Sequence, residues 1–200
     1  SVHLMYGFVR EPKWIAAHLL TLLLLIAFMC AGFWQFGRHQ ARGERNENVV
    51  ERSNAAVLTE ADLFESANDI EFRMVALEGT WSPDDAVLIR NRSHQEMAGC
   101  HLAVPLAISD AQAVLVVVGW LHQSSCDVGQ LEPPSKTVSL TGRVRLSQNR
   151  GAIGARDPSS GILTSLARTD VARVDQQVSF LLAPVYVELI TSTPSATSAI

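Results

Sequence analysis

The pattern of apolar and polar residues divides the chain into one long apolar stretch near its start and a longer part in which short apolar runs alternate with polar turns. Between Lys13 and Arg38 no residue carries a permanent charge. At 1.5 Å per residue, a helix over 14–36 is about 34 Å long, enough to cross a hydrocarbon core of roughly 30 Å. The pattern predicts a transmembrane helix over 14–36, preceded by a short leader over 1–13.

The two ends of this stretch favour an anchor that stays in the mature protein. Trp14 opens the stretch and Trp34 closes it, and amphipathic rings are favoured at the two headgroup levels of a bilayer. A cleaved signal peptide has a shorter apolar region and a small-x-small cleavage site. The exit here, from Gly32 to Phe36, is bulky instead. A retained membrane anchor is therefore the favoured interpretation.

Residues 37–70 are predicted to form a stalk or linker. The segment 38–52 is charged and has no apolar stripe, so it either continues the anchor helix in solvent or serves as a linker. Thr59, followed by acidic residues, predicts one short capped helix. At the other end, 191–200 is rich in Thr, Ser, Ala and Pro, and its low hydrophobicity predicts a disordered linker.

From Glu71 onward the apolar pattern becomes that of strands. Ala113 to Leu121 is nearly unbroken and predicts a central strand buried on both faces, whereas 137–145 alternates cleanly. Strands are predicted over 72–78, 87–89, 101–106, 113–121, 137–145 and 180–190. The predicted fold is one N-terminal transmembrane helix plus a mainly antiparallel β domain over 71–190, sandwich- or barrel-like, with one or two short helices.

The charge of this remainder bears on its partners. From Gly37 onward the chain carries 14 Lys and Arg residues against 19 Asp and Glu residues, a net charge of −5. A nucleic-acid-binding protein needs a basic face for the phosphates. The composition therefore argues against nucleic acid as a partner.

The three cysteines leave two possibilities open. Cys30 lies in the predicted anchor, whereas Cys100 and Cys126 lie in the domain that follows. In an oxidising compartment a bridge between these two would stabilise the fold by about 3–4 kcal/mol on the chain-entropy model. Two free buried thiols are an equally good interpretation.

A metal site is the less favoured interpretation of the histidines and cysteines. His94, His101 and His122, with the two cysteines, offer imidazole and thiolate ligands for copper or zinc. Their spacings match no standard signature, and the neighbours Cys100 and His101 would point to opposite faces of a strand. No metal site is predicted.

Five arginines occupy polar positions of the predicted strands, and two interpretations of them are open. If they share a face, they could bind a carboxylate or the propionates of a haem through paired hydrogen bonds. The favoured alternative is a solvated face on which they pair with Glu71, Glu78 and Glu188. The arginines are Arg73, Arg90, Arg92, Arg143 and Arg145.

Seven short segments together resemble the surfeit-locus family of cytochrome c oxidase assembly factors. The first, Gly32-Phe33-Trp34-Gln35-Phe36-Gly37-Arg38, is similar to the family's Gly-x-Trp-Gln followed by a basic residue at the membrane exit. The others follow in family order at 72–81, 87–92, 99–106, 114–121, 141–144 and 184–188. Each segment alone is weakly specific, whereas seven in order are fairly specific.

The resemblance implies a bacterial member of the family that is not an enzyme. It implies haem a as a transient cofactor, and as partner the catalytic subunit of cytochrome c oxidase or a respiratory supercomplex. It also implies an anchor in the bacterial plasma membrane, with the β domain on the extracytoplasmic side. The basic residues that flank the anchor, two before it and three soon after it, slightly favour the cytoplasmic side instead, although long domains translocate with little regard to such charges. The chain departs from the family in having Val118-Gly119-Trp120 where Arg-Gly-Trp is usual. The family's second membrane helix, with a proposed haem-ligating histidine, cannot be placed on this sequence.

Five residues are the candidate site residues. His18 is an ionisable group within the predicted span, so it is a candidate haem ligand. Its position near the interface also fits a plain contact with headgroups or water, which is the favoured interpretation. Trp34, Gln35 and Arg38 at the membrane exit, and Trp120 at a strand end, are candidates for binding a partner. For Trp120 a structural role in the core is favoured.

Three functions are compatible with these patterns. The first is a membrane-anchored assembly factor for haem-copper oxidase that assists haem a insertion or stabilises an assembly intermediate of the catalytic subunit. The second is a permanent accessory subunit of a respiratory complex, which would be stoichiometric in purified oxidase. A membrane-tethered enzyme is least favoured, because the sequence has no Gly-x-Ser-x-Gly elbow, no phosphate-binding Gly-x-x-x-x-Gly-Lys and no Cys-x-x-Cys.

Overall fold

The computed structural model describes residues 11–65, 67, 69–128, 137–149 and 154–195. Its contacts divide the chain into two compact units, Ser1–Val49 and Val50–Ile200. Each is described by itself, and the second unit is called the β-domain. Most of the predicted leader and half of the predicted C-terminal linker lie outside the described residues.

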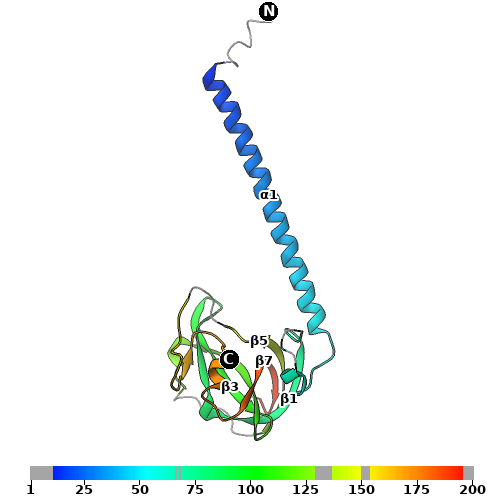
Figure 1. Cartoon of the computed structure of the whole chain (residues 1–200), viewed down its shortest axis with the longest axis vertical. Helices are drawn as coiled ribbons and strands as arrows, with labels where there is room; N and C mark the ends of the chain where they lie inside the picture. Colours follow the sequence, from blue (N-terminus) through cyan, green and yellow to red (C-terminus); the bar gives the residue numbers. More distant parts are fainter. Residues whose placement is uncertain (1–10, 66, 68, 129–136, 150–153, 196–200) are drawn as a thin grey trace, which may run out of the picture. The chain divides into compact units, whose positions relative to one another are not determined.

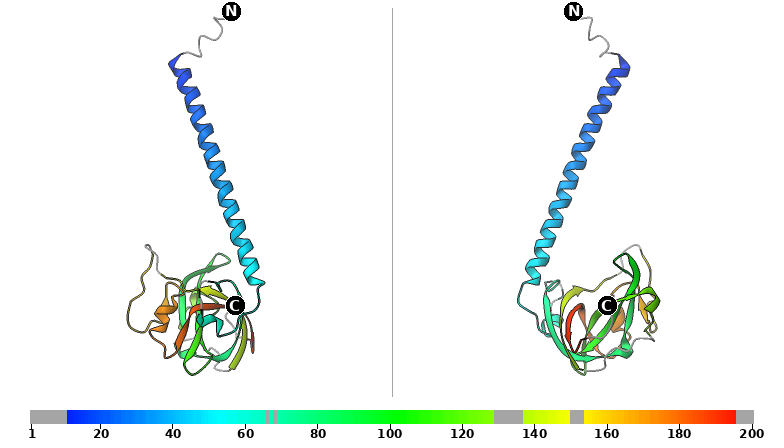
Figure 2. Two further views of the ribbon diagram at one scale, coloured as in Figure 1. Left: turned by 45° about the vertical axis from the view of Figure 1, so that its right-hand side comes forward. Right: turned by 180° about the vertical axis from the view of Figure 1, so that it is seen from behind.

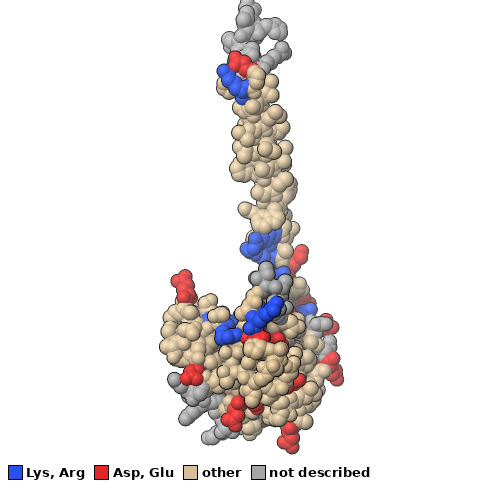
Figure 3. Space-filling model, turned by 60° about the vertical axis from the view of Figure 1, so that its left-hand side comes forward, with Lys and Arg blue, Asp and Glu red and all other residues tan. Residues whose placement is uncertain are grey.

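The first unit consists of most of α1 (Pro12–Ser53), a helix without a break (Figure 1). None of its residues is buried; Phe28 is 71% exposed and Phe33 is 73% exposed. Figure 3 shows that the apolar part of its surface carries no Lys or Arg between the charged groups at its two ends. The hydroxyl of Thr21 donates to the carbonyl of Ala17 (2.9 Å), so this polar group is satisfied within the helix.

Within the described residues, α1 is the one helix long and apolar enough to cross a membrane. This confirms the predicted fold class of an N-terminal membrane helix followed by a β domain. The charged segment 38–52 is helical, so of the two interpretations the continuation of the anchor helix is correct.

The described part of the β-domain contains seven strands and short helical turns. Its helices are α2 (Asp62–Glu65), the 3₁₀ turns η3 (Pro83–Asp85) and η4 (Gln123–Ser125), and α3 (Val171–Asp175). Its strands are β1 (Met74–Trp81), β2 (Val87–His94), β3 (Met97–Ala107), β4 (Gln112–His122), β5 (Thr137–Leu146), β6 (Ser165–Leu166) and β7 (Leu181–Thr193).

The seven strands form one sheet in the order β1-β5-β7-β4-β3-β2-β6. The last residues of β1 also pair with β3, so β1, β5, β7, β4 and β3 close into a barrel (Figure 2). Most pairs are antiparallel, whereas β4–β7 and β2–β6 are parallel. Closure removes the unpaired edges that an open sheet of these five strands would expose. Of the two predicted architectures, the barrel is the correct one.

The central position of β4 confirms the prediction made for the apolar run from Ala113. Five consecutive residues of β4, from Ala113 to Val117, are buried. A β-bulge follows, because Leu102 faces Gly119 whereas Ala103 faces Val117, which leaves Val118 without an opposite residue. The bulge turns the remaining side chains of β4, and Trp120 then lies directly opposite His101 on β3.

Two local predictions were wrong. The first strand begins at Met74, not at Phe72, because Phe72 has a left-handed backbone (φ 69°) and donates its N–H to the carbonyl of Val144. The second concerns β6, a strand of two residues that was not predicted between the strands predicted over 137–145 and 180–190. A strand of two residues has no detectable period, so no sequence pattern marks it.

Apolar side chains fill two separate cores. One lies inside the barrel and contains inward residues such as Val104, Val116 and Val187. The other lies on the outside of the barrel, where α3 and β6 cover Ala103, Leu115 and Tyr186. The polar margin of the second core is formed by the remaining side chains of the same strand faces, and it carries the candidate site described below.

The cysteines of the β-domain form a disulfide, Cys100–Cys126. Their Cα atoms are 6.1 Å apart, and Cys100 is 2% exposed within the barrel core. This decides between the two possibilities left by the sequence. It also confirms that Cys100 and His101 point to opposite faces of β3, since His101 lies outside the core. Cys30 on α1 is free and exposed.

Candidate partner-binding face

The outer side of the barrel carries the candidate site, which is called the outer face. It is formed by side chains of β3, β4, β7 and β5. These side chains point to the outside of the barrel, where the second core lies. Strand register places Arg145 directly opposite Tyr186 and Arg143 opposite Glu188. Because side chains two apart in a strand share a face, Glu188 continues the row begun by Tyr186. The outer face is defined by His101, Trp120, Arg145, Tyr186 and Glu188.

Trp120 is the centre of an aromatic group at one end of this face. Its ring centroid lies 5.6 Å from that of His94 and 6.1 Å from that of His122, the second in an edge-on arrangement. Its indole N–H donates to the carbonyl oxygen of Arg92 (2.8 Å). The ring thereby links β4 to β2 across β3 and is half-buried.

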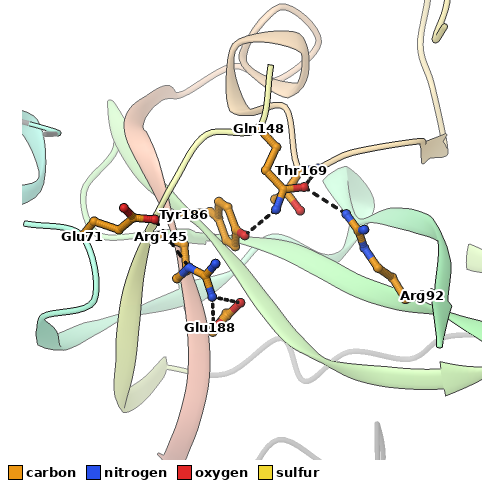
Figure 4. A network of polar contacts seen from close by, with 7 residues as sticks. All are labelled: Glu71, Arg92, Arg145, Gln148, Thr169, Tyr186 and Glu188. Atoms are coloured by element: carbon orange, nitrogen blue, oxygen red, sulfur yellow. Dashed lines mark hydrogen bonds and ion pairs between the residues drawn. The ribbon is translucent and has the colours of Figure 1, made fainter. Parts of the chain in front are cut away.

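An ion-pair network lies on the neighbouring strands (Figure 4). The Arg145 guanidinium lies 3.2 and 3.3 Å from the two carboxylate oxygens of Glu188, and 3.9 Å from Glu71. It also stacks over the Phe72 ring at 5.0 Å. For Arg145, therefore, the prediction of pairing with acidic residues is confirmed, and its charge is already balanced.

A second network links Tyr186 to Arg92 through Gln148 (Figure 4). The Gln148 amide nitrogen donates to the Tyr186 hydroxyl (3.1 Å). The amide oxygen of Gln148 accepts from Arg92 (3.0 Å) and from the backbone N–H of Thr169 (3.4 Å). Because each side of the amide has matching partners, its orientation is fixed. Burial raises the pKa of Tyr186, so this hydroxyl stays protonated at neutral pH.

His101 lies between these groups and favours the neutral form. Burial lowers its pKa, and the positive charge of Arg92 lowers it further, while Glu188 acts weakly in the opposite direction. A neutral imidazole beside a half-buried indole and a balanced ion pair gives a surface with little net charge. Such a surface suits contact with a protein partner better than acid–base chemistry.

Comparison with known proteins decides the family. The model of the SURF1 family matches residues 22–199, most of α1 and the whole β-domain. The chain belongs to the SURF1 family. It is 25% identical over 164 residues to SURF1-like proteins of Mycobacterium bovis and of two strains of Mycobacterium tuberculosis, which are named as uncharacterised. The match covers 76% of this chain and 58% of the length of these relatives.

The membrane-exit residues of this SURF1-family chain are all on α1. Trp34 is 64% exposed, and the Arg38 guanidinium lies 5.4 Å from the centre of its ring. A cation over an indole is a stabilising pair, so the two side chains hold one another. Gln35 follows Trp34 in the sequence and is also exposed. Their partner-binding role stays a prediction.

His18 lies one turn after Trp14 on α1, with the two ring centroids 6.5 Å apart. It is exposed along the helix, and the second axial partner that haem ligation requires would have to come from elsewhere. Its role as a haem ligand stays a prediction. In the β-domain, Cys100 and Cys126 are bonded to each other, so neither is a thiolate ligand in this state. Among the described residues no three His, Cys, Asp or Glu side chains are placed to hold a metal ion.

The arginines considered from the sequence do not act as one group. Arg145 pairs with Glu188, Arg73 donates to the carbonyl of Ala56 (2.8 Å), and Arg90 pairs with Asp157. Sequence reasoning missed Gln148 and Thr169 because both lie in the segment after β5, where no period marks a position. Tyr186 could have been found, since it lies within the last segment of the family resemblance.

Proposed function

We propose that this chain is a membrane-anchored assembly factor for cytochrome c oxidase that stabilises an assembly intermediate of the catalytic subunit. The observation that supports it is the SURF1-family match over 22–199, which includes most of α1 and the complete barrel. In this proposal α1 packs beside helices of the oxidase, and the outer face of the barrel contacts the extramembrane part of the complex.

The exposed apolar surface of α1 supports contact with other helices in the bilayer. Gln35 offers an amide for a hydrogen bond between helices, and Gly32, which has no side chain and has open space around it, lets a neighbouring backbone approach. Photo-crosslinking at Trp34 should capture the catalytic subunit, whereas a crosslinker at Glu47, on the charged part of α1, should capture much less. Equal capture at both positions would contradict a specific helix contact.

The Cys100–Cys126 disulfide supports an extracytoplasmic β-domain, because disulfides persist in oxidising compartments and are rare in the cytosol. A membrane-impermeant thiol reagent should label the β-domain of intact cells only after reduction. Labelling that requires cell lysis would place the β-domain on the cytoplasmic side.

Haem a belongs to this proposal as a transient ligand, with His18 as the candidate axial residue. The imidazole of His18 would hold the haem iron, and any further ligand of the iron would come from a partner. Purified chain titrated with haem should show a Soret shift that His18→Ala abolishes and His39→Ala leaves intact. An identical shift in His18→Ala would remove this residue from the proposal.

Deletion of the gene tests the proposed function as a whole. Assembled oxidase and its haem a content should fall several-fold, while other respiratory complexes stay within normal amounts, and reintroduced wild-type chain should restore both. Normal oxidase spectra and activity in a strain without a second copy would contradict the proposal. If the chain is stoichiometric in mature purified oxidase, it is a permanent subunit instead of an assembly factor.

A further inference from the structure

A polar cleft of about 540 Å³ lies beside β2, between that strand and the segment that follows β5. It is called the arginine cleft. Its polar lining consists of Arg90, Asn91, Arg92, Gln148, Asn149 and Arg168, with two alanines completing the wall. This lining contains three guanidinium groups and three amides, and no carboxylate.

The charges of the arginine cleft are only partly balanced. Arg90 pairs with Asp157, whose second oxygen accepts the backbone N–H of Ala167 (2.8 Å). Arg92 donates to the neutral amide of Gln148, and Arg168 donates to the carbonyl of Ala155 (3.0 Å). Among the described residues neither of these two guanidinium groups has a carboxylate within 4.0 Å. Two positive charges are thus unpaired in a chain whose net charge is −4.

The backbone and the networks of the outer face hold the cleft in shape. Register shifts between Ile89 and Arg92, and Asn91 has a left-handed backbone (φ 58°), so β2 turns at this point. The carbonyl of Arg92 accepts from Trp120, and its guanidinium is fixed by Gln148, which Tyr186 holds in turn. A site whose donors are already positioned loses little entropy on binding.

We propose that the arginine cleft binds a ligand through a phosphate dianion. Two unpaired guanidinium groups match two negative charges, and the planar fork of arginine forms paired hydrogen bonds with phosphate oxygens. The amide groups of Asn91 and Asn149 offer further donors at the rim. The volume falls within the roughly 300–1,000 Å³ typical of small-molecule sites, so the phosphate belongs to a small organic molecule or to a lipid headgroup.

Trp120 provides a local probe, because its indole N–H bonds to the Arg92 carbonyl. The full chain, labelled with ¹⁵N-tryptophan in a neutral detergent, is titrated with inorganic phosphate at constant ionic strength. The Trp120 indole signal, identified by Trp120→Phe, should shift with saturation, while that of Trp81 in the barrel core stays in place. Acetate should give no comparable shift.

Matched variants test which arginines carry the binding. Arg92→Gln and Arg168→Gln should each weaken phosphate binding about tenfold, whereas Arg73→Gln, which removes the same charge outside the cleft, should bind like wild type. Arg168→Gln is the decisive variant, because Arg168 takes no part in the Trp120 and Tyr186 networks. Absence of a saturable Trp120 shift, or undiminished binding by Arg168→Gln, would overturn the proposal.

A second experiment decides whether the phosphate belongs to a lipid headgroup or to a soluble molecule. The chain is placed in nanodiscs of phosphatidylcholine, with or without phosphatidic acid. A Trp120 shift that appears with phosphatidic acid assigns a lipid headgroup to the cleft, and a shift that requires free phosphate assigns a soluble ligand. A shift in neither arm overturns the proposal. The result is independent of oxidase assembly, so each proposal can fail without the other.

Discussion

The indole N–H of Trp120 donates to the carbonyl oxygen of Arg92 at 2.8 Å, and this bond joins β4 to β2 across the intervening strand β3. Such a bond satisfies a carbonyl at the β-bulge of β2, where the regular ladder is interrupted. It also places a large ring over the outer side of β3. This hydrogen bond therefore supports the structural role that was favoured for Trp120 from the sequence.

Two replacements of Trp120 separate the contribution of its ring to stability from that of its hydrogen bond. Trp120→Phe keeps most of the ring and loses the donor, so it should cost about 1 kcal/mol of unfolding free energy. Trp120→Ala also loses the packing and should cost about 2–3 kcal/mol, since the ring is half-buried. Thermal unfolding in neutral detergent measures both. An unchanged midpoint in Trp120→Ala, combined with loss of oxidase co-purification, would show that Trp120 is a partner contact.

Gly99 lies directly beneath the Trp120 ring. A Cβ at this position would collide with the carbonyl oxygen of Leu121 and lie 2.5 Å from two atoms of the Trp120 ring. Because the colliding carbonyl is backbone, Gly99→Ala should shift β3 against β4 and destabilise the β-domain by about 1–3 kcal/mol. Gly43→Ala on α1, where a Cβ meets nothing within 4 Å, is the matched control and should leave the midpoint unchanged.

The Cys100–Cys126 disulfide should contribute strongly to stability. It joins residues 26 positions apart, so its removal should cost about 3–4 kcal/mol on the chain-entropy model. Thermal unfolding of the Cys100→Ser/Cys126→Ser double variant should match that of reduced wild type. Cys30→Ser, which removes the free cysteine of α1, should unfold like wild type with and without reductant. A reductant effect of equal size in the double variant would contradict this assignment.

The lowered pKa of His101 predicts that the stability of the β-domain decreases as pH falls. Its pKa is lowered in the folded state by burial and by Arg92, so the unfolded chain takes up the proton first as pH falls. Stability from this residue is therefore complete well above its ordinary pKa of about 6.5 and is lost as pH falls below it. Between pH 7.5 and 5 the melting temperature should fall more in wild type than in His101→Gln. His39→Gln, which removes an exposed histidine on α1, should follow wild type; a wild-type slope in His101→Gln would contradict the prediction.

Membrane attachment through α1 predicts that the protein stays in the membrane fraction when membranes are washed. The chain should stay with membranes through washes at high salt and at pH 11, because a hydrophobic span does not depend on charge. Recovery of intact chain in the wash, together with a known peripheral protein, would contradict the anchor.

The parts that the sequence predicted well are those with a long local pattern. The apolar run of β4 and the alternation of β5 each needed no knowledge of distant residues, and both strands are present with nearly the predicted bounds. The parallel pairing of β4 with β7 joins segments far apart in the chain, and no local pattern encodes that choice. For this reason the barrel could be named only as one of two architectures.

In the candidate site too, residues within a local pattern were predicted and residues outside one were missed. Arg145 and Glu188 were considered together because they occupy polar positions of strands with visible alternation. Gln148 was missed, although it links Tyr186 to Arg92, because its place depends on how the segment after β5 folds back over the sheet. The disulfide stayed an open choice, since the sequence carries no signal for the 6.1 Å separation of the two Cα atoms.

The position of β7 has a consequence for synthesis of the protein. β7 follows the other described strands in sequence, yet it lies between β4 and β5 and completes the barrel. Until it emerges, these two earlier strands have edges with no partner, and such edges favour aggregation. At roughly 5–20 residues per second, the ribosome needs several seconds to make residues 147–193 after β5. The nascent barrel must therefore stay soluble, or be held by a chaperone, throughout this interval, and β7 should be the strand whose deletion or truncation most strongly prevents accumulation of the protein.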